Sequence, residues 1–200
     1  MINIRKIEEK DIDSVVALHC EAFQGFFLTS LGNDFLRCYY SCFIKSEETI
    51  SVCAEENGKM LGFAVSTKSS KGFNSRMVKQ NLIKFGCLAI KLLMTNPKAL
   101  LRLVKNFSKT SEVVEDNEDY AELFSIAVSP KAQGLGLGKQ LLTETENFMI
   151  REDVSKLSLT TDYYNNESAV RFYESKGYGV LYEFDTYPQR RMYRMIKQLM

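Results

Sequence analysis

The chain has 200 residues, of which 45% are hydrophobic and 26% charged, a composition typical of one globular domain. Its formal net charge of +1 argues against a protein whose whole surface binds a polyanion. No basic segment followed by an apolar one opens the sequence, and no apolar run is long enough to cross a bilayer, so we expect a cytoplasmic protein.

The first third of the chain predicts a strand, two helices and a β-hairpin. Residues 1–7 alternate as a strand does, whereas residues 11–23 and 32–45 repeat apolar side chains at helical spacing. Two alternating runs in residues 49–68 flank Asn57-Gly58, a dipeptide that favours the type I′ hairpin turn because both central residues need a positive φ.

A basic segment follows the hairpin. Between Lys68 and Ser111 there are ten Lys or Arg and no Asp or Glu, whereas residues 112–122 carry six acids. Residues 75–109 predict two amphipathic helices broken at Asn96-Pro97. We treat residues of about 68–111 as an insert made of these two helices.

Each predicted helix of the insert has an apolar and a basic side. The first has Val78, Leu82, Phe85, Ala89 and Leu92 opposite Lys84 and Lys91, and the second has Leu101, Val104 and Phe107 opposite Lys98, Arg102, Lys105 and Lys109. The pattern fits helices that pack on the domain with solvated basic backs, a lid that welcomes an anionic substrate, or a surface that contacts anionic lipid. Nucleic acid is less favoured, because aromatic residues are not interleaved with the basic ones.

The remaining chain predicts alternating strands and helices. Residues 120–128 and 156–162 read as strands, and a helix between them follows a glycine-rich loop. Residues 165–177 predict a short helix with Asn166 as its N-cap and Gly177 at C′, and the tail turns near Pro188 between two last strands. The order indicates a mixed α+β domain.

Cysteine and histidine provide no set of metal ligands. The chain contains one histidine, His19, and five cysteines without a CxxC pair, namely Cys20, Cys38, Cys42, Cys53 and Cys87. We therefore expect reduced, packed thiols and no metal, and we expect His19 to be a packed or surface residue and not a catalytic base.

The glycine-rich loop, in the sequence AVSPKAQGLGLGKQLL of residues 127–142, predicts an anion site. Gly134 and Gly138 are too close for a P-loop, and Lys139 is not followed by Ser or Thr. The GxGxG pattern also lacks the spacing of a dinucleotide fingerprint. Backbone N–H groups at the start of the following helix, with glycines that admit close approach, suit a diphosphate. A glycine-softened strand-to-helix turn is the alternative interpretation.

Two motifs in order resemble the GNAT N-acetyltransferase superfamily. Gln133-x-x-Gly136-x-Gly138 after a strand resembles its acetyl-CoA loop, and the second signature is matched by Asn166, Ala169, Tyr173 and Gly177-Tyr178. The resemblance implies one domain over residues 1–200, with a central, mostly antiparallel mixed sheet between helices on both faces. The insert is longer than a typical member has at that place.

The resemblance also implies which residues bind the cofactor, acetyl-CoA. They are Ile126, Ala127, Val128, Gln133, Gly134, Leu135, Gly136, Leu137, Gly138, Lys139, Asn166 and Tyr173. The strand end would splay from its neighbour, with the Val128 N–H as oxyanion donor, while the alternating leucines pack the helix onto the sheet. Tyr173 would protonate the departing sulfur, unless it simply packs, and Asn166 would cap its helix, hold the cofactor, or both.

Glu122 is the best candidate for the catalytic base. It lies eleven residues before Gln133. In the family that the chain resembles, histone-type members that use a strand glutamate have the same spacing. Simple alternation would point it the same way as Phe124, Ile126 and Val128, toward an apolar face that raises a carboxyl pKa. It also ends an acidic run and fits a solvated strand end, and Asp162 and Glu183 are weaker rivals.

Together these features predict an enzyme that transfers acetyl from acetyl-CoA to a primary amine by direct attack in a ternary complex, without a metal. A small molecule or amino sugar is favoured over a protein N-terminus as the acceptor. A homodimer and a peripheral membrane contact through residues 75–109 stay open as partners. The alternative is a non-catalytic CoA-binding or membrane-associated module on the same fold.

Overall fold

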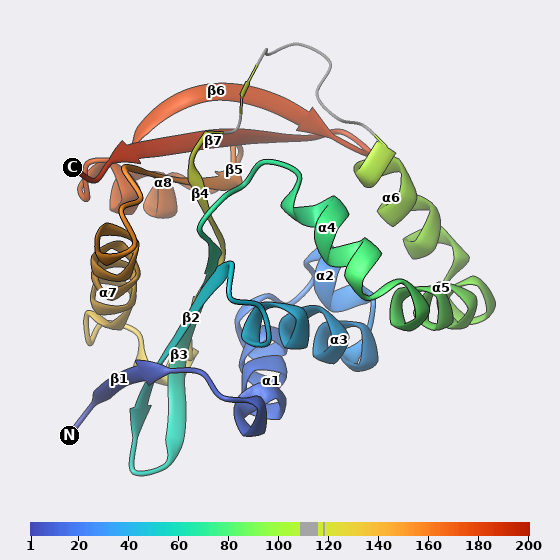
Figure 1. Ribbon diagram of the computed structural model, residues 1–200, viewed down its shortest axis with the longest axis horizontal. Helices are drawn as coiled ribbons and strands as arrows, with labels where there is room; N and C mark the ends of the chain where they lie inside the picture. Colours follow the sequence, from blue (N-terminus) through green and yellow to red (C-terminus); the bar gives the residue numbers. More distant parts are fainter. Residues whose placement is uncertain (109–115, 118) are drawn as a thin grey trace.

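The computed structural model describes residues 1–108, 116–117 and 119–200 (Figure 1). The strands within them are β1 (Asn3–Lys6), β2 (Thr49–Glu56), β3 (Lys59–Thr67), β4 (Ala121–Val128), β5 (Lys156–Asp162), β6 (Gly179–Thr186) and β7 (Arg190–Gln198). The helices are α1 (Ile12–Ala22), α2 (Phe27–Ser30), α3 (Asn33–Ile44), α4 (Phe73–Gln80), α5 (Leu82–Thr95), α6 (Pro97–Ser108), α7 (Leu137–Arg151) and α8 (Glu167–Glu174).

All the described strands belong to one sheet. Its order is β1-β2-β3-β4-β5-β7-β6, and every neighbouring pair is antiparallel except β4 and β5, which are parallel. The chain returns from β4 to β5 through α7, as a parallel connection requires. The predicted mixed, mostly antiparallel sheet is therefore confirmed.

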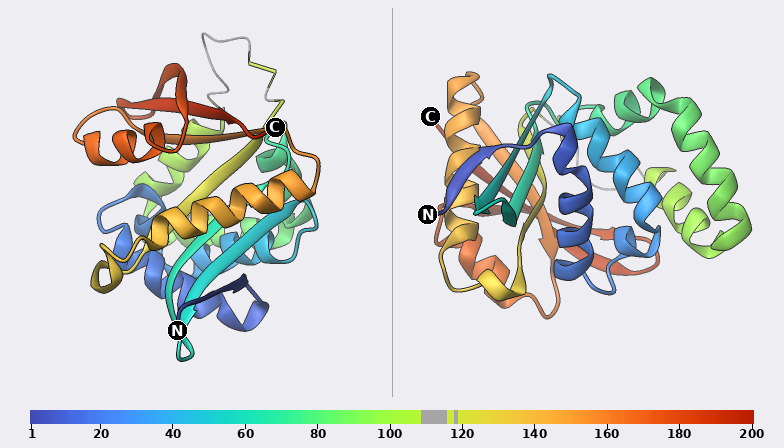
Figure 2. Two further views of the ribbon diagram at one scale, coloured as in Figure 1. Left: turned by 90° about the vertical axis from the view of Figure 1, so that its left-hand side faces the viewer. Right: turned by 90° about the horizontal axis from the view of Figure 1, so that it is seen from below.

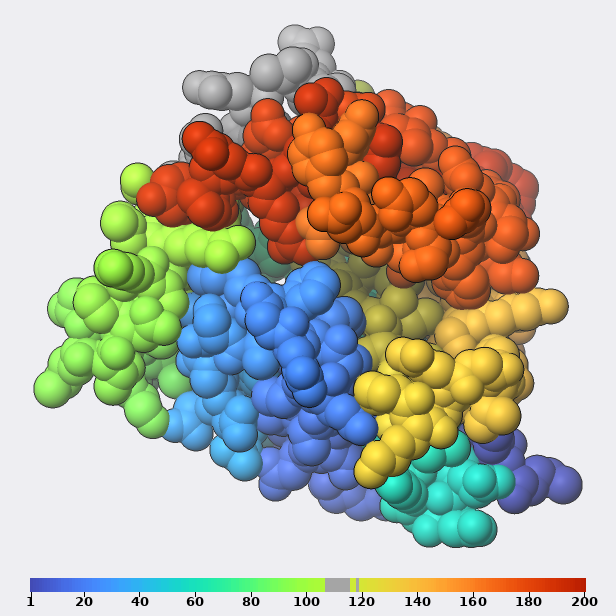
Figure 3. All heavy atoms as spheres, turned by 180° about the vertical axis from the view of Figure 1, so that it is seen from behind, coloured from blue at the N-terminus to red at the C-terminus, as the bar shows by residue number. Residues whose placement is uncertain are grey.

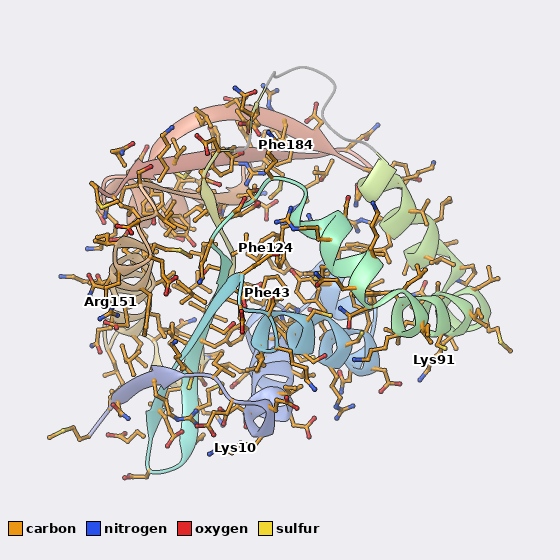
Figure 4. The ribbon with its side chains drawn as sticks, viewed as in Figure 1. Lys10, Phe43, Lys91, Phe124, Arg151 and Phe184 are labelled. Atoms are coloured by element: carbon orange, nitrogen blue, oxygen red, sulfur yellow. The ribbon has the colours of Figure 1, made fainter. Side chains whose placement is uncertain are left out.

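Helices cover both faces of this sheet. α7 crosses the strands on one face, and α1 and α3 lie on the opposite face (Figures 1 and 2). The α7 face buries aliphatic side chains such as Leu141, Leu157 and Met195. The α3 face is aromatic, and in Figure 4 Phe43 and Phe124 meet at its centre, with ring centroids 5.2 Å apart. These two cores fix the central strands between the helix layers.

Local signals predicted the short-range structure well. Asn57 and Gly58 have φ angles of 51° and 78°, so the expected hairpin turn joins β2 to β3. Gly177 has a φ of 87°, and the Tyr178 N–H donates to the Tyr173 carbonyl at 3.1 Å, as expected at the end of α8. Pro188 lies in the turn between β6 and β7.

The insert contains three helices within the described residues, so the prediction of two was wrong. The break before Pro97 is present, but α4 and α5 are separated at Asn81, which ends one helix and begins the other. The Asn81 side-chain amide donates to the Met77 carbonyl at 3.1 Å, a local bond with which asparagine competes against helix continuation. Apolar periodicity runs through such a break and does not reveal it.

The α5–α6 pair stands at the edge of the molecule farthest from α7 (Figures 1 and 2). Leu92 and Ala99 are buried and join the α3 core, and Phe85 packs beside them. Lys109 and the side chain of Phe107 lie outside what the structure describes. In the described part of the chain, no helix is both long and apolar enough to cross a membrane.

A β-bulge in β4 reverses the faces of its side chains. Val65 stands opposite Ser125 and Ser66 opposite Leu123, so Phe124 is an extra residue on β4. Glu122 therefore lies on the opposite face of β4 from Ile126 and Val128, whereas simple alternation predicts that all three share a face. Ile126 and Val128 pack on the α7 side, whereas Phe124 packs in the α3 core.

Candidate active site

β4 and β5 part halfway along their length. They are in register at Ala121–Leu123 and Leu157–Leu159, but β4 continues to Val128 and β5 to Asp162 without a further paired residue in these described strands. The Ser129 N–H donates to the Leu61 carbonyl at 2.8 Å, on the β3 side. Because amides alternate along a strand, the N–H groups of Ile126 and Val128 point to the other side, into the opening. The expected splay is thus present.

The glycine-rich loop lies at the carboxyl end of β4, beside this opening. Gly134 and Gly136 have φ angles of 83° and 72°, and apart from the adjoining residues no heavy atom lies within 4 Å of where their Cβ atoms would be. Gly136 occupies the N-cap of α7, whose first turn contains no acidic residue. Exposed amides at the positive end of a fifteen-residue helix, with open space before them, fit a diphosphate well.

The two leucines of the loop differ in role. Leu137 is buried in the α7 core, as expected, but Leu135 is 58% exposed and does not pack on the sheet. A Cβ on Gly138 would lie 3.9 Å from side-chain atoms of both Val128 and Phe172. The start of α7 therefore lies where β4 and α8 converge, so one extended ligand can reach all three. Gln133, Lys139 and Gly134 are exposed at the same place.

Tyr173 is buried on α8, between the rings of Phe172 and Tyr178. Its hydroxyl has no hydrogen-bond partner among the described residues, and burial raises its pKa to about 12. The phenol is therefore protonated at neutral pH and available as a donor.

Asn166 occupies the N-cap position of α8, but its side chain does not cap the helix. Its amide donates instead to the Thr161 hydroxyl at 2.6 Å and to the Asp162 carbonyl at 3.3 Å. The cap prediction is right in position and wrong in contact, because the Asn166 side chain turns toward the end of β5 to donate there and its oxygen accepts from no N–H group of the first turn of α8. Asn166 thereby ties α8 to the β5 side of the splay.

Each of the three candidate bases is paired with an arginine of β7. Glu122 is buried and accepts from Arg194 at 2.6 Å and from the Ser70 hydroxyl at 2.5 Å. The apolar surroundings predicted for Glu122 are therefore wrong. The two rivals are paired as well, Asp162 with Arg190 at 2.6 Å and Glu183 with Arg191 at 2.5 Å.

A basic and aromatic mouth lies where α2, α6 and the turn between β6 and β7 meet. The Arg190 guanidinium lies over the Phe26 ring at 5.4 Å, and that of Arg102 lies over Phe27 at 4.5 Å. Within the described chain no carboxylate pairs with Arg102, and its Nε is buried without a hydrogen-bond partner. Burial, and next the positive charge of Arg190, lower the pKa of Arg102.

Figure 3 shows the mouth as a hollow between the blue helices and the red-orange β6, β7 and α8. Atoms of β4 lie at its floor, so the mouth and the splay belong to one cleft. The basic stripe of the insert pointed to Arg102 but not to its neighbours. No signal in the sequence indicated that Arg190 and Arg194 would pair with the carboxylates, because these contacts join residues 28 and 72 positions apart.

His19 lies behind β4 and is 2% exposed. Its Nδ1 is 2.7 Å from the Tyr40 hydroxyl, which donates to Ser125 of β4 at 3.4 Å, and its Nε2 is 3.2 Å from the Thr29 hydroxyl. Burial lowers the pKa of the imidazole to about 4. Of the two positions that the sequence left open for His19, packed or on the surface, it occupies the packed one, and it helps to fix α1 and α3 against β4.

The cysteines are free, and burial raises the pKa of Cys42 to about 12 and that of Cys53 to about 11. Such thiols are poor nucleophiles at neutral pH. Among the described residues no group of three or more His, Cys, Asp or Glu side chains is arranged to hold a metal ion.

Comparison with known proteins agrees with this geometry. The model of the acetyltransferase (GNAT) family matches residues 12–178. Among solved structures, the Escherichia coli ribosomal-protein-S18-alanine N-acetyltransferase aligns over 100% of this chain and 94% of its own, with 20% identity and a TM-score of 0.64. No curated protein sequence gives a significant match.

Two similar structures were solved with the cofactor. YncA, a putative acetyltransferase from Salmonella typhimurium with acetyl-CoA, is 16% identical, with 100% and 95% of the two chains covered and a TM-score of 0.64. The PaiA N-acetyltransferase from Thermoplasma acidophilum, in complex with coenzyme A, is 15% identical, with 99% of each chain covered and a TM-score of 0.55. At these identities the likeness shows the fold.

The free energy of unfolding will fall as the pH is lowered from about 7 to 5, because His19 resists protonation in the folded chain. The unfolded chain binds this proton below about pH 6.5 and the folded chain only near pH 4, so the pKa difference costs about 2 kcal/mol by pH 5. Urea unfolding across this range measures the loss. His19→Gln removes the chain's one histidine and should flatten the curve; an equal slope in both proteins would contradict the assignment.

Proposed function

Because the chain belongs to the GNAT acetyltransferase family, with acetyl-CoA as its acetyl donor, we propose that it acetylates the primary amine of a small, negatively charged acceptor. The observation that carries the proposal is the cleft: exposed helix amides, two free strand amides and a basic mouth follow one another along it. We take the whole chain as one catalytic domain.

The donor would lie along the splay. The amides from Gly134 to Lys139 would bind its pyrophosphate, with Gln133 at the rim. The strand segment Ile126 to Val128 would bind the pantetheine chain through the N–H groups that face the opening. Asn166 would contribute by holding α8 against β5, since its amide is already engaged there.

Acetyl transfer places three demands on the protein. The Val128 N–H would donate to the carbonyl oxygen on which negative charge develops, in a position fixed by the β3–β4 pairing. Tyr173 would donate its proton to the leaving thiolate, because a phenol with a pKa of about 12 stays protonated until the sulfur acquires charge. The amine, with an ordinary pKa of about 10.4, must also lose a proton.

Glu122 receives a structural role in this proposal. Both of its carboxylate oxygens already accept short hydrogen bonds, one from Arg194 and one from Ser70. A buried, paired carboxylate of this kind ties β4 to β7 across β5 at the root of the splay. We assign removal of the amine proton to solvent at the cleft mouth.

The mouth favours an acceptor with a carboxylate or phosphate group. Arg102 and Arg190 lie close enough for their charges to oppose each other, and an anion between them would relieve that repulsion. Phe26 and Phe27 beneath the guanidinium groups narrow the opening. A small acidic amine or a phosphorylated amino sugar fits these features better than a protein N-terminus.

A panel of amines tests the proposal directly. Release of CoA from acetyl-CoA would be followed with a thiol reagent in the presence of neutral amines, amino sugars, their phosphates and short peptides. Turnover is expected with acidic small amines and not with peptides. A protein that binds acetyl-CoA but acetylates no amine would instead be a non-catalytic CoA-binding module.

A negative charge at Gly138 should weaken coenzyme A binding without harming the fold. Gly138→Asp and Gly138→Asn add side chains of equal size at the second residue of α7, where an acid is favourable to the helix itself. Repulsion of the pyrophosphate should make the Asp variant bind CoA about tenfold or more weakly than the Asn variant. Titration calorimetry measures both; equal affinities would place the phosphates elsewhere.

Loss of the Tyr173 hydroxyl should slow the reaction and leave binding intact. Tyr173→Phe is expected to lower kcat roughly a hundredfold, the usual contribution of a general acid, with little change in the Kd for acetyl-CoA. The matched control is Tyr178→Phe, which loses a 3.0 Å hydrogen bond to Glu146 and should lower stability but not kcat. Unchanged turnover in Tyr173→Phe would remove its catalytic role.

A further inference from the structure

The α5–α6 hairpin, residues 82–108, exposes an unusual amount of apolar surface. Of the fifteen large apolar side chains that are exposed among the described residues, seven belong to it. They are Leu82, Ile83, Ile90, Leu93, Met94, Leu101 and Val104, and Ile83 and Met94 are more than 80% exposed. A patch of this kind on one element marks an interaction surface more often than chance exposure does.

The exposed side chains form one stripe along α5. The stripe consists of exposed residues at intervals of three or four, namely Ile83, Cys87, Ile90 and Met94. The inward side of the same helix is also apolar, with Leu92 buried against the α3 core. α5 therefore has a second apolar face beyond the one that the fold consumes. This corrects the expectation of a basic outward face, since Leu82 and Leu101, which the periodicity placed on the packed sides, are more than half exposed.

Positive charge surrounds this stripe. Residues 68–108 contain nine Lys or Arg and no acid. Lys91, labelled at the outer edge of α5 in Figure 4, is paired with Asp34. Lys84 and Lys98 are exposed and have no acidic partner among the described residues, and Lys105 lies over the Tyr187 ring at 4.2 Å.

From this arrangement we infer that the α5–α6 hairpin docks the protein on an anionic lipid surface, with the α5 stripe inserted among the acyl chains. Helices that lie in a membrane interface combine an apolar face with lysine-rich flanks, and each lysine near an anionic surface adds to the attraction. With fourteen residues, α5 would lie in the interface and not cross it.

Charge favours lipid over the other occupants of an apolar face. A second copy bound to α5 would bring two acid-free, lysine-rich hairpins together. Lys84 and Lys98 of one copy would then be repelled by the lysines of the other. Nucleic acid would match the charge, but it stacks its bases on aromatic rings, and the stripe is aliphatic.

Docking would also orient the cleft. α6 contacts the turn between β6 and β7, where the Tyr187 N–H donates to Asn106 Oδ1 at 2.9 Å. That turn leads into Arg190 at the mouth. The hairpin therefore connects the lipid-facing edge to the acceptor side of the cleft, so docking would bring the mouth close to the membrane surface.

Vesicle flotation of the full chain tests the inference. Binding is expected to vesicles of phosphatidylcholine mixed with phosphatidylglycerol, to weaken at high salt because charges are screened, and to be nearly absent with pure phosphatidylcholine. Ile83→Ser with Ile90→Ser should lower the partition coefficient roughly tenfold or more. Lys84→Gln with Lys98→Gln should lower it by about the same factor.

Matched controls are available elsewhere on the surface. Val180→Ser with Leu181→Ser removes two exposed apolar side chains of β6, and Lys10→Gln with Lys59→Gln removes two exposed lysines; neither pair should change flotation. Circular dichroism checks that every variant folds.

Failure of the unaltered chain to float with anionic vesicles would overturn the inference. So would flotation that the hairpin variants leave unchanged. Light scattering that shows a dimer, dissociated by the Ile83 and Ile90 substitutions, would assign the stripe to a second copy instead.

Discussion

The structure depends on the parting of β4 from β5 after three paired residues. In a closed sheet the amides of Ile126 and Val128 would be consumed by the next strand, and no backbone donor would face a ligand. Here β3 holds β4 on one side through to Ser129, so the strand stays extended although its other edge is open. The opening also lets the start of α7 approach β4 and α8 closely. The parting of β4 from β5 therefore creates both the cleft and the free backbone amides that a cofactor could bind.

The ion pairs of β7 maintain this opening from the other side. Arg194 binds Glu122 at the root of the splay, and Arg190 binds Asp162 at the end of β5. Asn166 then joins that same strand end to α8. The carboxylates of Glu122 and Asp162 are both paired, so these contacts stiffen the polar side of the cleft. In the proposed mechanism the carboxylates that resembled catalytic bases are parts of the frame. Tyr173 and Arg102 are polar side chains of the cleft for which the described residues offer the hydroxyl no hydrogen-bond partner and the guanidinium no carboxylate.

The insert links the cleft to the α3 core and to the outer edge of the molecule. Its inner face completes the α3 core through Leu92 and Ala99, while its outer face carries the exposed stripe and the exposed lysines Lys84 and Lys98. α6 connects these two surfaces to the turn before Arg190. A helical pair with two apolar faces buries only one of them by folding, which is why we infer a partner for the outward one.

The sequence by itself determined what depends on near neighbours. The Asn57-Gly58 turn, the glycines before α7 and the end of α8 at Gly177 follow from backbone preferences over a few residues, and two motifs sufficed to indicate the family. Tertiary structure decided the rest. The extra residue at Phe124 turned Glu122 away from Ile126, and Arg194, 72 residues further on, supplied its partner. Periodicity reports which side chains are apolar, but packing against distant strands decides which of them are buried, and so left Ile83 and Met94 in solvent.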